Sequence, residues 1–268
     1  MLRQARSTST TSNPDLVPLE RPARMGNVAW VEAALADVGR RTLPASSACV
    51  LLLGGADALA FRLRVAQSHL RADMLPSYWS ECVLLERNGE RLADARIIHV
   101  PLNTPHDDLF PPDSNGLVWR PFTDFDDPAQ WPNIALLGLP VTQDAVIERV
   151  DAFRKARSTL DALEHVLRWL AFAWGVAKTG NPLNDNYGLP SACMLETVCA
   201  GAQLDLTPGL EARASCPEAM WIAARFWQDY FRKFHKRAIA GRYWHAHAYP
   251  IWEPGDGPRT PPKARRSR

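Results

Sequence analysis

The fold is decided by the stretch Gly188-Leu189-Pro190-Ser191-Ala192-Cys193-Met194-Leu195-Glu196, which Thr207-Pro208-Gly209 and Ser215-Cys216-Pro217-Glu218 follow. Proline is tolerated in the first turn of a helix. The pattern therefore predicts a loop, a buried helix from Pro190 to Ala202, a turn, and a long helix from Pro217 to Arg237. Serine with glutamate three residues later is typical of a capping box, so Ser215 is the predicted N-cap of the long helix.

Helical geometry separates the two nucleophilic side chains of the first helix. Successive residues turn by about 100°, so Ser191 shares a face with Leu195, Val198 and Ala202. On the same basis, Cys193 lies about 160° from Ser191 around the helix axis. The two side chains therefore cannot face one common partner, and either of them is a candidate nucleophile.

The first half of the chain is rich in predicted strands. Cys49–Leu53 is a short apolar run ending at two glycines, as a buried strand does. Tyr78–Arg87 and Ala95–Leu102 are predicted to form a hairpin around Asn88-Gly89. Further strands are predicted at Leu117–Phe122 and Ile134–Leu139, and further helices at Asn27–Arg40, Ala56–Leu70, Gln143–Arg157 and Leu160–Trp174. Strands come first and helices cluster later, which favours an α+β fold with a mostly antiparallel sheet packed by helices.

The ends of the chain differ in composition from its centre. Residues 1–25 are rich in Arg, Ser, Thr and Pro, and residues 251–268 are basic and rich in Pro. Both ends are predicted to be disordered tails. Residues 26–250 are predicted to form a single domain, because 46% of the 268 residues are hydrophobic and can fill one substantial core.

Net charge, the length of apolar runs and the cysteine count limit the classes of function that the chain can have. A formal net charge of +2 gives no drive toward nucleic acid. No apolar run approaches the roughly 20 residues that cross a bilayer, so no transmembrane segment is expected. Five cysteines without a CxxC pair indicate reduced thiols and a cytoplasmic chain, with a mitochondrial location as the alternative suggested by the N-terminal composition. No pattern predicts a metal or a cofactor.

Residues 48–230 resemble the circularly permuted branch of the papain-like superfamily, which includes NlpC-type amidases and lecithin retinol acyltransferases. Three segments carry the resemblance: Gln67-Ser68-His69 through Pro76-Ser77-Tyr78-Trp79-Ser80-Glu81, then Ile97-Ile98-His99-Val100-Pro101-Leu102, and finally the stretch that begins at Pro190-Ser191. The resemblance implies a permuted papain-like fold with hydrolase or acyltransferase ancestry.

The resemblance also implies where reactive residues would stand. The family places histidine on one strand, a polar orienting residue on the next, and cysteine at the start of a later helix. This chain has Glu81 at the histidine position and His99 at the position that often holds a carboxylate. Ser191 stands at the cysteine position, because the apolar pair at three and four positions after it matches the family pattern. Cys193 is the alternative nucleophile in a shifted register.

Chemistry at these positions depends on the hairpin register. A loop centred on Glu90 would set Glu81 opposite His99, whereas a two-residue Asn88-Gly89 turn would set Glu81 opposite Arg96. In the first case His99 could act as base and Glu81 could orient it, giving Ser191 a Ser-His-Glu arrangement. The pattern allows both registers.

Two functions follow from the substitutions. The first is a catalytically degenerate member that acts as a binding or assembly component, because the expected cysteine and histidine are both replaced. The alternative is an active amide, ester or thioester hydrolase, or an acyltransferase, that uses Ser191 or Cys193 with His99 and Glu81. A protein partner is expected in the first case, and an acyl or peptide-like small molecule in the second. A third reading is an α+β interaction protein unrelated to the superfamily.

Overall fold

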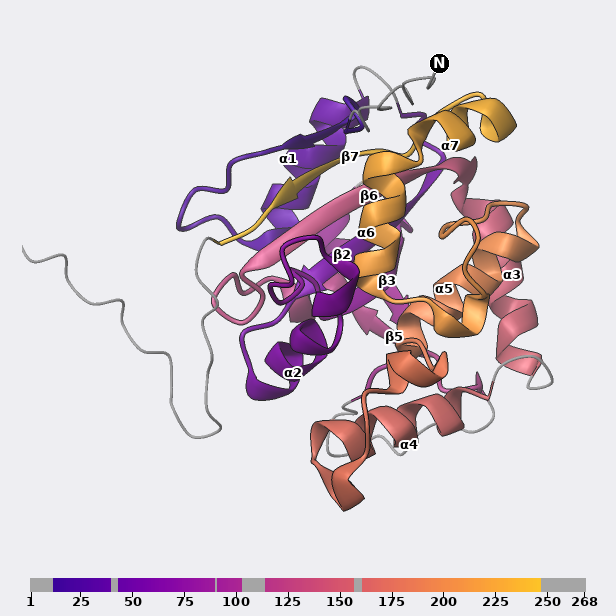
Figure 1. Ribbon diagram of the computed structural model, residues 1–268. Coiled ribbons are helices and arrows are strands. Elements are labelled where there is room, and N and C mark those ends of the chain that lie inside the picture. Colours follow the sequence, from indigo (N-terminus) through magenta and orange to yellow (C-terminus); the bar gives the residue numbers. More distant parts are fainter. Residues whose placement is uncertain (1–11, 40–42, 90, 103–113, 157–160, 247–268) are drawn as a thin grey trace, which may run out of the picture.

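The computed structural model describes residues 12–39, 43–89, 91–102, 114–156 and 161–246, and the described residues form one seven-stranded sheet (Figure 1). The strands lie in the order β1-β7-β6-β2-β3-β4-β5. Their bounds are β1 (Leu16–Pro18), β2 (Ser47–Gly54), β3 (Glu81–Glu86), β4 (Arg96–His99), β5 (Val118–Pro121), β6 (Asn133–Thr142) and β7 (Ala240–Trp244). Only β1 and β7 run parallel, and the other neighbours are antiparallel. The predicted α+β class with a mostly antiparallel sheet is confirmed.

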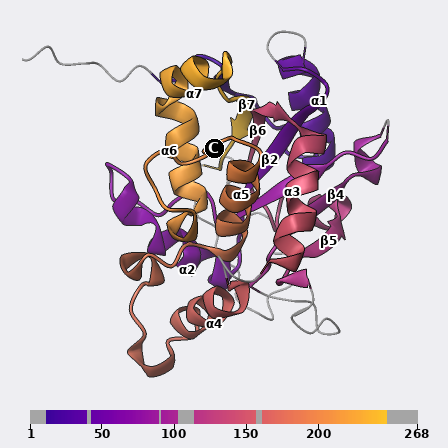
Figure 2. The ribbon, with the colours of Figure 1, turned by 90° about the vertical axis from the view of Figure 1, so that its right-hand side faces the viewer.

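Helices cover the two faces of the sheet unequally. The first helix, α1 (Asn27–Gly39), packs on one face together with the short 3-10 turns after β3 and β5. The opposite face carries the remaining helices (Figures 1 and 2). They are α2 (Ala58–Ala66), α3 (Gln143–Lys155), α4 (Ala162–Ala173), α5 (Pro190–Gly201), α6 (Pro217–Phe226) and α7 (Gln228–His235).

The side chains of the central strand β2 explain why helices must pack on both faces of the sheet. All eight of its residues are buried, and their side chains alternate between two apolar cores. Cys49, Leu51 and Leu53 pack on the α1 face, while Val50 and Leu52 pack under the other helices. A continuous apolar run of this kind is what a strand covered on both faces requires.

The predicted N-terminal tail, residues 1–25, extends into a part of the chain that is folded. Residues 1–11 and the predicted C-terminal tail, 251–268, lie outside the described residues, but Leu16–Pro18 forms an edge strand of the sheet. The amide of Asn13 holds this strand by donating to the carbonyls of Ala224 and Ile239. A strand of three residues is too short to show a clear alternation of apolar and polar side chains. The sequence pattern therefore does not predict it.

The long helix predicted from Pro217 to Arg237 is interrupted. The chain departs from helical geometry at Trp227, where φ is −100° and ψ is 23°, and this separates α6 from α7. The predicted capping box is also wrong, because the N-cap is Cys216 and the hydroxyl of Ser215 has no hydrogen-bond partner among the described residues. Glu218 is used elsewhere, as described below.

Candidate functional site

Ser191 lies in the first turn of α5, where Pro190 starts the helix. Its hydroxyl donates to the carbonyl oxygen of Val100 at 3.0 Å and accepts from the amide of Val100 at 3.1 Å. Val100 directly follows β4, where the paired register of β3 and β4 has ended at Leu84 and Ile98. The hydroxyl therefore replaces a missing strand partner, and both of its hydrogen-bonding functions are used by the backbone.

Cys193 is buried on the same helix. Its thiol faces the carbonyl oxygens of Arg213 and Ser215 at 3.1 and 3.8 Å. Burial raises the pKa of this thiol well above its ordinary value, and nearby Cys216 raises it further. A thiolate is the reactive form, so this environment suppresses the reactivity of the thiol.

The other thiols behave alike. All five cysteines are buried, and burial raises the pKa of Cys49 to about 11 and that of Cys216 to about 12. For Cys82 and Cys199 burial likewise raises the pKa well above the ordinary value. Buried thiols of this kind behave as small apolar groups.

Glu81 and His99 come together on the α1 face of the sheet. Glu81 Oε2 lies 3.6 Å from His99 Nδ1, and the His99 ring meets the Phe125 ring edge-on at 5.8 Å between centroids. Neither of the two expected registers occurs, because Leu84 pairs with Ile98 and Glu86 with Arg96. Counting on from these pairs sets His99 opposite Val83 rather than Glu81. The shift from the Glu90-centred register is even, so Glu81 and His99 still share a face as diagonal neighbours.

The structure does not bring Ser191 to His99. Ile97 belongs to the α1-side core and Ile98 to the other core, so the alternation of β4 directs His99 toward α1. Ser191 reaches the end of the same strand from the opposite face, where α5 packs. The sheet thus separates the Glu81–His99 pair from both candidate nucleophiles.

A buried polar cluster in the α2–β3 segment was not anticipated. Glu218, at the start of α6, accepts a 2.6 Å hydrogen bond from the Ser77 hydroxyl, and its Oε1 lies 3.9 Å from Arg71. Its amide donates to the side chain of Gln67. Burial raises the pKa of Glu218, whereas the bond from Ser77 lowers it. The only local signal was the Ser215–Glu218 spacing, and that spacing suggested a cap rather than a long-range clamp.

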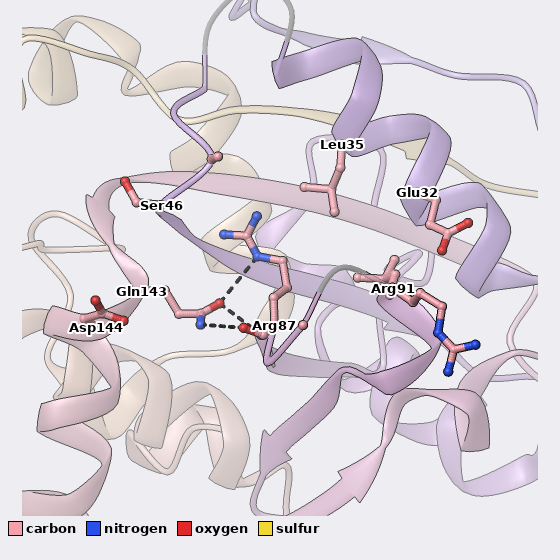
Figure 3. Close-up of a pocket in the computed structure, with 10 residues that line it drawn as sticks. Glu32, Leu35, Ser46, Arg87, Arg91, Gln143 and Asp144 are labelled. Atoms are coloured by element: carbon pink, nitrogen blue, oxygen red, sulfur yellow. Dashed lines mark hydrogen bonds between the residues drawn. The ribbon is translucent and has the colours of Figure 1, made fainter.

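A cavity of about 500 Å³ opens between α1, the β3–β4 connection and the start of α3 (Figure 3). Arg87 lies at its centre and is held by Gln143, whose Oε1 accepts from both the amide and the guanidinium of Arg87. Arg87 also donates to the carbonyl of Ser47. Glu32 and Leu35 reach into the cavity from α1, and Arg91 lies at the Glu32 end (Figure 3).

A second hollow, of about 680 Å³, lies between α5 and α7. Its wall includes Glu196, whose carboxylate accepts from the amide of Leu206 at 3.0 Å and from the amide and hydroxyl of Thr207. Burial raises the pKa of Glu196 to about 7, the charge of Asp205 raises it too, and the bonds from Thr207 and Leu206 lower it. These bonds tie the loop after α5 to the helix, which is a structural task for the carboxylate.

The chain has no match among protein-family models, curated proteins or solved structures. Its resemblance to the permuted papain-like proteins therefore rests on the quoted residues alone. In the part of the chain that the structure describes, no group of three or more His, Cys, Asp or Glu side chains is arranged to hold a metal ion. Within the same ranges, no helix has the length and apolarity needed to cross a bilayer.

Proposed function

We propose that this chain is a permuted papain-like domain that has lost hydrolase chemistry and acts as a binding or assembly component. The contact between the first turn of α5 and the end of β4 supports the lineage, because the family brings the start of its nucleophile helix to the strands of the sheet. The partner is expected to be a protein, or a small acyl or peptide-like molecule held without being cleaved.

The single observation that carries this proposal is the state of the Ser191 hydroxyl. A serine nucleophile needs a base within hydrogen-bond reach to take its proton. Here the hydroxyl donates its hydrogen bond to the carbonyl oxygen of Val100, and a backbone carbonyl is too weak a base to remove the proton. The histidine that the resemblance would provide lies on the other face of the sheet, beside Glu81. Attack by this hydroxyl would leave two buried backbone groups without a partner.

Cys193 does not offer a substitute. Its thiol lies among backbone carbonyls, which disfavour a negative charge, and burial holds its pKa far above neutral. A reactive cysteine instead lies in an electropositive and partly exposed environment. The proposal therefore holds for either register of the nucleophile helix.

Turnover assays on the full chain test the proposal. The chain would be incubated with a p-nitrophenyl ester, an acyl thioester and a peptide amide, alongside Ser191→Ala and Cys193→Ser. We expect the same background rate for all three proteins. A fluorophosphonate should not label Ser191, and iodoacetamide should label the cysteines only after unfolding in urea. Turnover that either substitution abolishes would overturn the proposal and support an active hydrolase.

A further inference from the structure

Among the described residues that line the cavity between α1 and α3, Arg87 is a cation without an ion pair. Arg87 is half-buried and is held only by the neutral acceptors Gln143 and Ser47. It makes no ion pair with any described residue, whereas the neighbouring Arg91 and Arg96 pair with acids at 2.9 and 2.8 Å. A guanidinium fixed in this way presents its remaining N–H groups to a planar anion at little further entropic cost.

The same cavity wall also carries Glu32. Glu32 is exposed on α1 and makes no ion pair within the described ranges. It lies one helical turn from Leu35, which projects into the space between Glu32 and Arg87 (Figure 3). Leu92 is buried and lines the same cavity. The cavity therefore offers a positive charge at its centre, an apolar wall at Leu35 and Leu92, and the carboxylate of Glu32 beyond that wall.

The charge balance decides which ligand class fits. Arg91 pairs with Asp94 at 2.9 Å on the surface, and Asp144 lies in the first turn of α3, where the helix dipole favours a negative charge. Among the described residues of the cavity wall, this leaves Arg87 as the arginine without an ion pair, and Glu32 and Asp144 as the acids without one. A phosphate dianion would be opposed by Glu32 and Asp144 and matched by one free arginine only. A molecule with one carboxylate and one ammonium would pair both Arg87 and Glu32.

We propose that this cavity binds a small zwitterion whose carboxylate and ammonium are separated by a short apolar chain. The carboxylate would lie on Arg87, the chain against Leu35 and Leu92, and the ammonium at Glu32. Arg87 and Glu32 stand on either side of Leu35, so an ordinary α-amino acid, whose ammonium and carboxylate are attached to one carbon, would pair with only one of them. A cavity of about 500 Å³ accommodates such a ligand. The proposal goes beyond the proposed function and is independent of it, because this cavity is built without Ser191, Cys193, Glu81 or His99.

Titration calorimetry with isomeric probes tests the proposal. ε-Aminocaproate carries its charges at opposite ends, norleucine carries the same atoms with adjacent charges, caproate lacks the ammonium, and inorganic phosphate tests for a general anion site. We expect ε-aminocaproate to bind most tightly and phosphate not to bind. Arg87→Gln should weaken binding of ε-aminocaproate and caproate by about tenfold or more, as expected for a charge-assisted hydrogen bond. Glu32→Gln should weaken ε-aminocaproate alone and leave caproate unchanged.

Two further variants complete the design. Arg154→Gln removes a partly exposed arginine of α3 outside the cavity and should bind all probes as the parent chain does. Arg87→Lys keeps the positive charge but lacks the planar guanidinium group. It replaces Arg87→Gln in the titrations if that variant fails to fold. Absence of ε-aminocaproate binding at millimolar concentration would overturn the proposal. Binding that neither Glu32→Gln nor an Arg87 substitution weakens would also overturn it, and preference for phosphate would replace it with a simple anion site.

Discussion

Glu81 and His99 lie 3.6 Å apart, Oε2 to Nδ1, on the face of the sheet that is opposite to Ser191. Only 2% of His99 is exposed, and neither of its ring nitrogens makes a hydrogen bond with a described residue. Glu81 is partly satisfied, since its Oε1 accepts from the amide of Cys82. The pair has the composition of a catalytic dyad, but neither candidate nucleophile, Ser191 or Cys193, lies on its side of the sheet. Its histidine is an incompletely satisfied buried group.

Replacing His99 should therefore cost little or no folding free energy. A buried polar group without a hydrogen bond costs about 1–3 kcal/mol of folding free energy, so its removal returns part of that amount. We expect His99→Leu to leave the free energy of unfolding unchanged or to raise it by about 1 kcal/mol. Ile97→Ala, on the same strand and face, should lower it by about 2–4 kcal/mol through cavity formation. Urea titration measures both, and a loss for His99→Leu as large as that for Ile97→Ala would contradict this account.

The sequence predicted the elements with strong local patterns. β2 appears as an apolar run, and α5 starts at Pro190 as its sequence indicates. β1 and the break at Trp227 could not be predicted, because contacts far along the chain determine them. The strand Leu16–Pro18 depends on Asn13, whose amide binds carbonyls more than two hundred residues away. Local periodicity contains no information about such contacts.

For the site, the sequence identified suggestive residues but not their partners. Ser191 was placed at a helix start, yet its role follows from where β3 and β4 separate and leave Val100 unpaired. The spacing of Ser215 and Glu218 predicted a helix cap, but the carboxylate of Glu218 binds Ser77 instead. The spacing in the sequence is the same in either case. Arg87 carries no signal in the sequence, since its lack of an ionic partner among the described residues is evident only in three dimensions. Each error concerns a contact across the fold.

Ser191→Ala should destabilise the chain without changing any turnover. The substitution leaves the amide and carbonyl of Val100 buried without a partner, which costs about 1–3 kcal/mol. Ser46→Ala is the matched control, because Ser46 is exposed and should change stability by less than about 0.5 kcal/mol. Equilibrium unfolding in urea, with the slope m compared between variants, measures the difference. An unchanged midpoint for Ser191→Ala would mean that the two bonds do not stabilise the fold.

Gly188→Ala should be among the most damaging single substitutions in the chain. A Cβ at this position would meet the carbonyl oxygen of Ser215 at 2.1 Å, and the backbone cannot move away without breaking the bond from Gly188 to Arg213. We expect a loss of at least about 2 kcal/mol, from overpacking and lost hydrogen bonds together. Gly180→Ala is the control, since nothing lies within 4 Å of a Cβ there. Thermal unfolding should separate the two variants, and equal melting temperatures would argue against close packing of this loop on the segment that precedes α6.

Glu196 gives the chain a pH dependence of defined sign. Its pKa is about 7 in the folded chain and near 4.5 when unfolded, mainly because burial disfavours the charged carboxylate. The folded state therefore binds the proton more tightly, so Glu196 makes the free energy of unfolding fall as pH rises from about 4.5 to about 7 and level off above that range. Each pKa unit corresponds to about 1.4 kcal/mol, so the full change is roughly 3 kcal/mol.

Glu196→Gln tests this dependence directly. The amide oxygen still accepts from the amides of Leu206 and Thr207, and the neutral side chain does not titrate. We therefore expect the variant to lose the decline between pH 4.5 and pH 7 and to be more stable than the parent chain at pH 8. Glu148→Gln, at an exposed position of α3, should follow the parent profile. Urea midpoints measured across this pH range decide the matter: parallel profiles for the parent chain and Glu196→Gln would show that Glu196 titrates normally and is not held in a desolvated site.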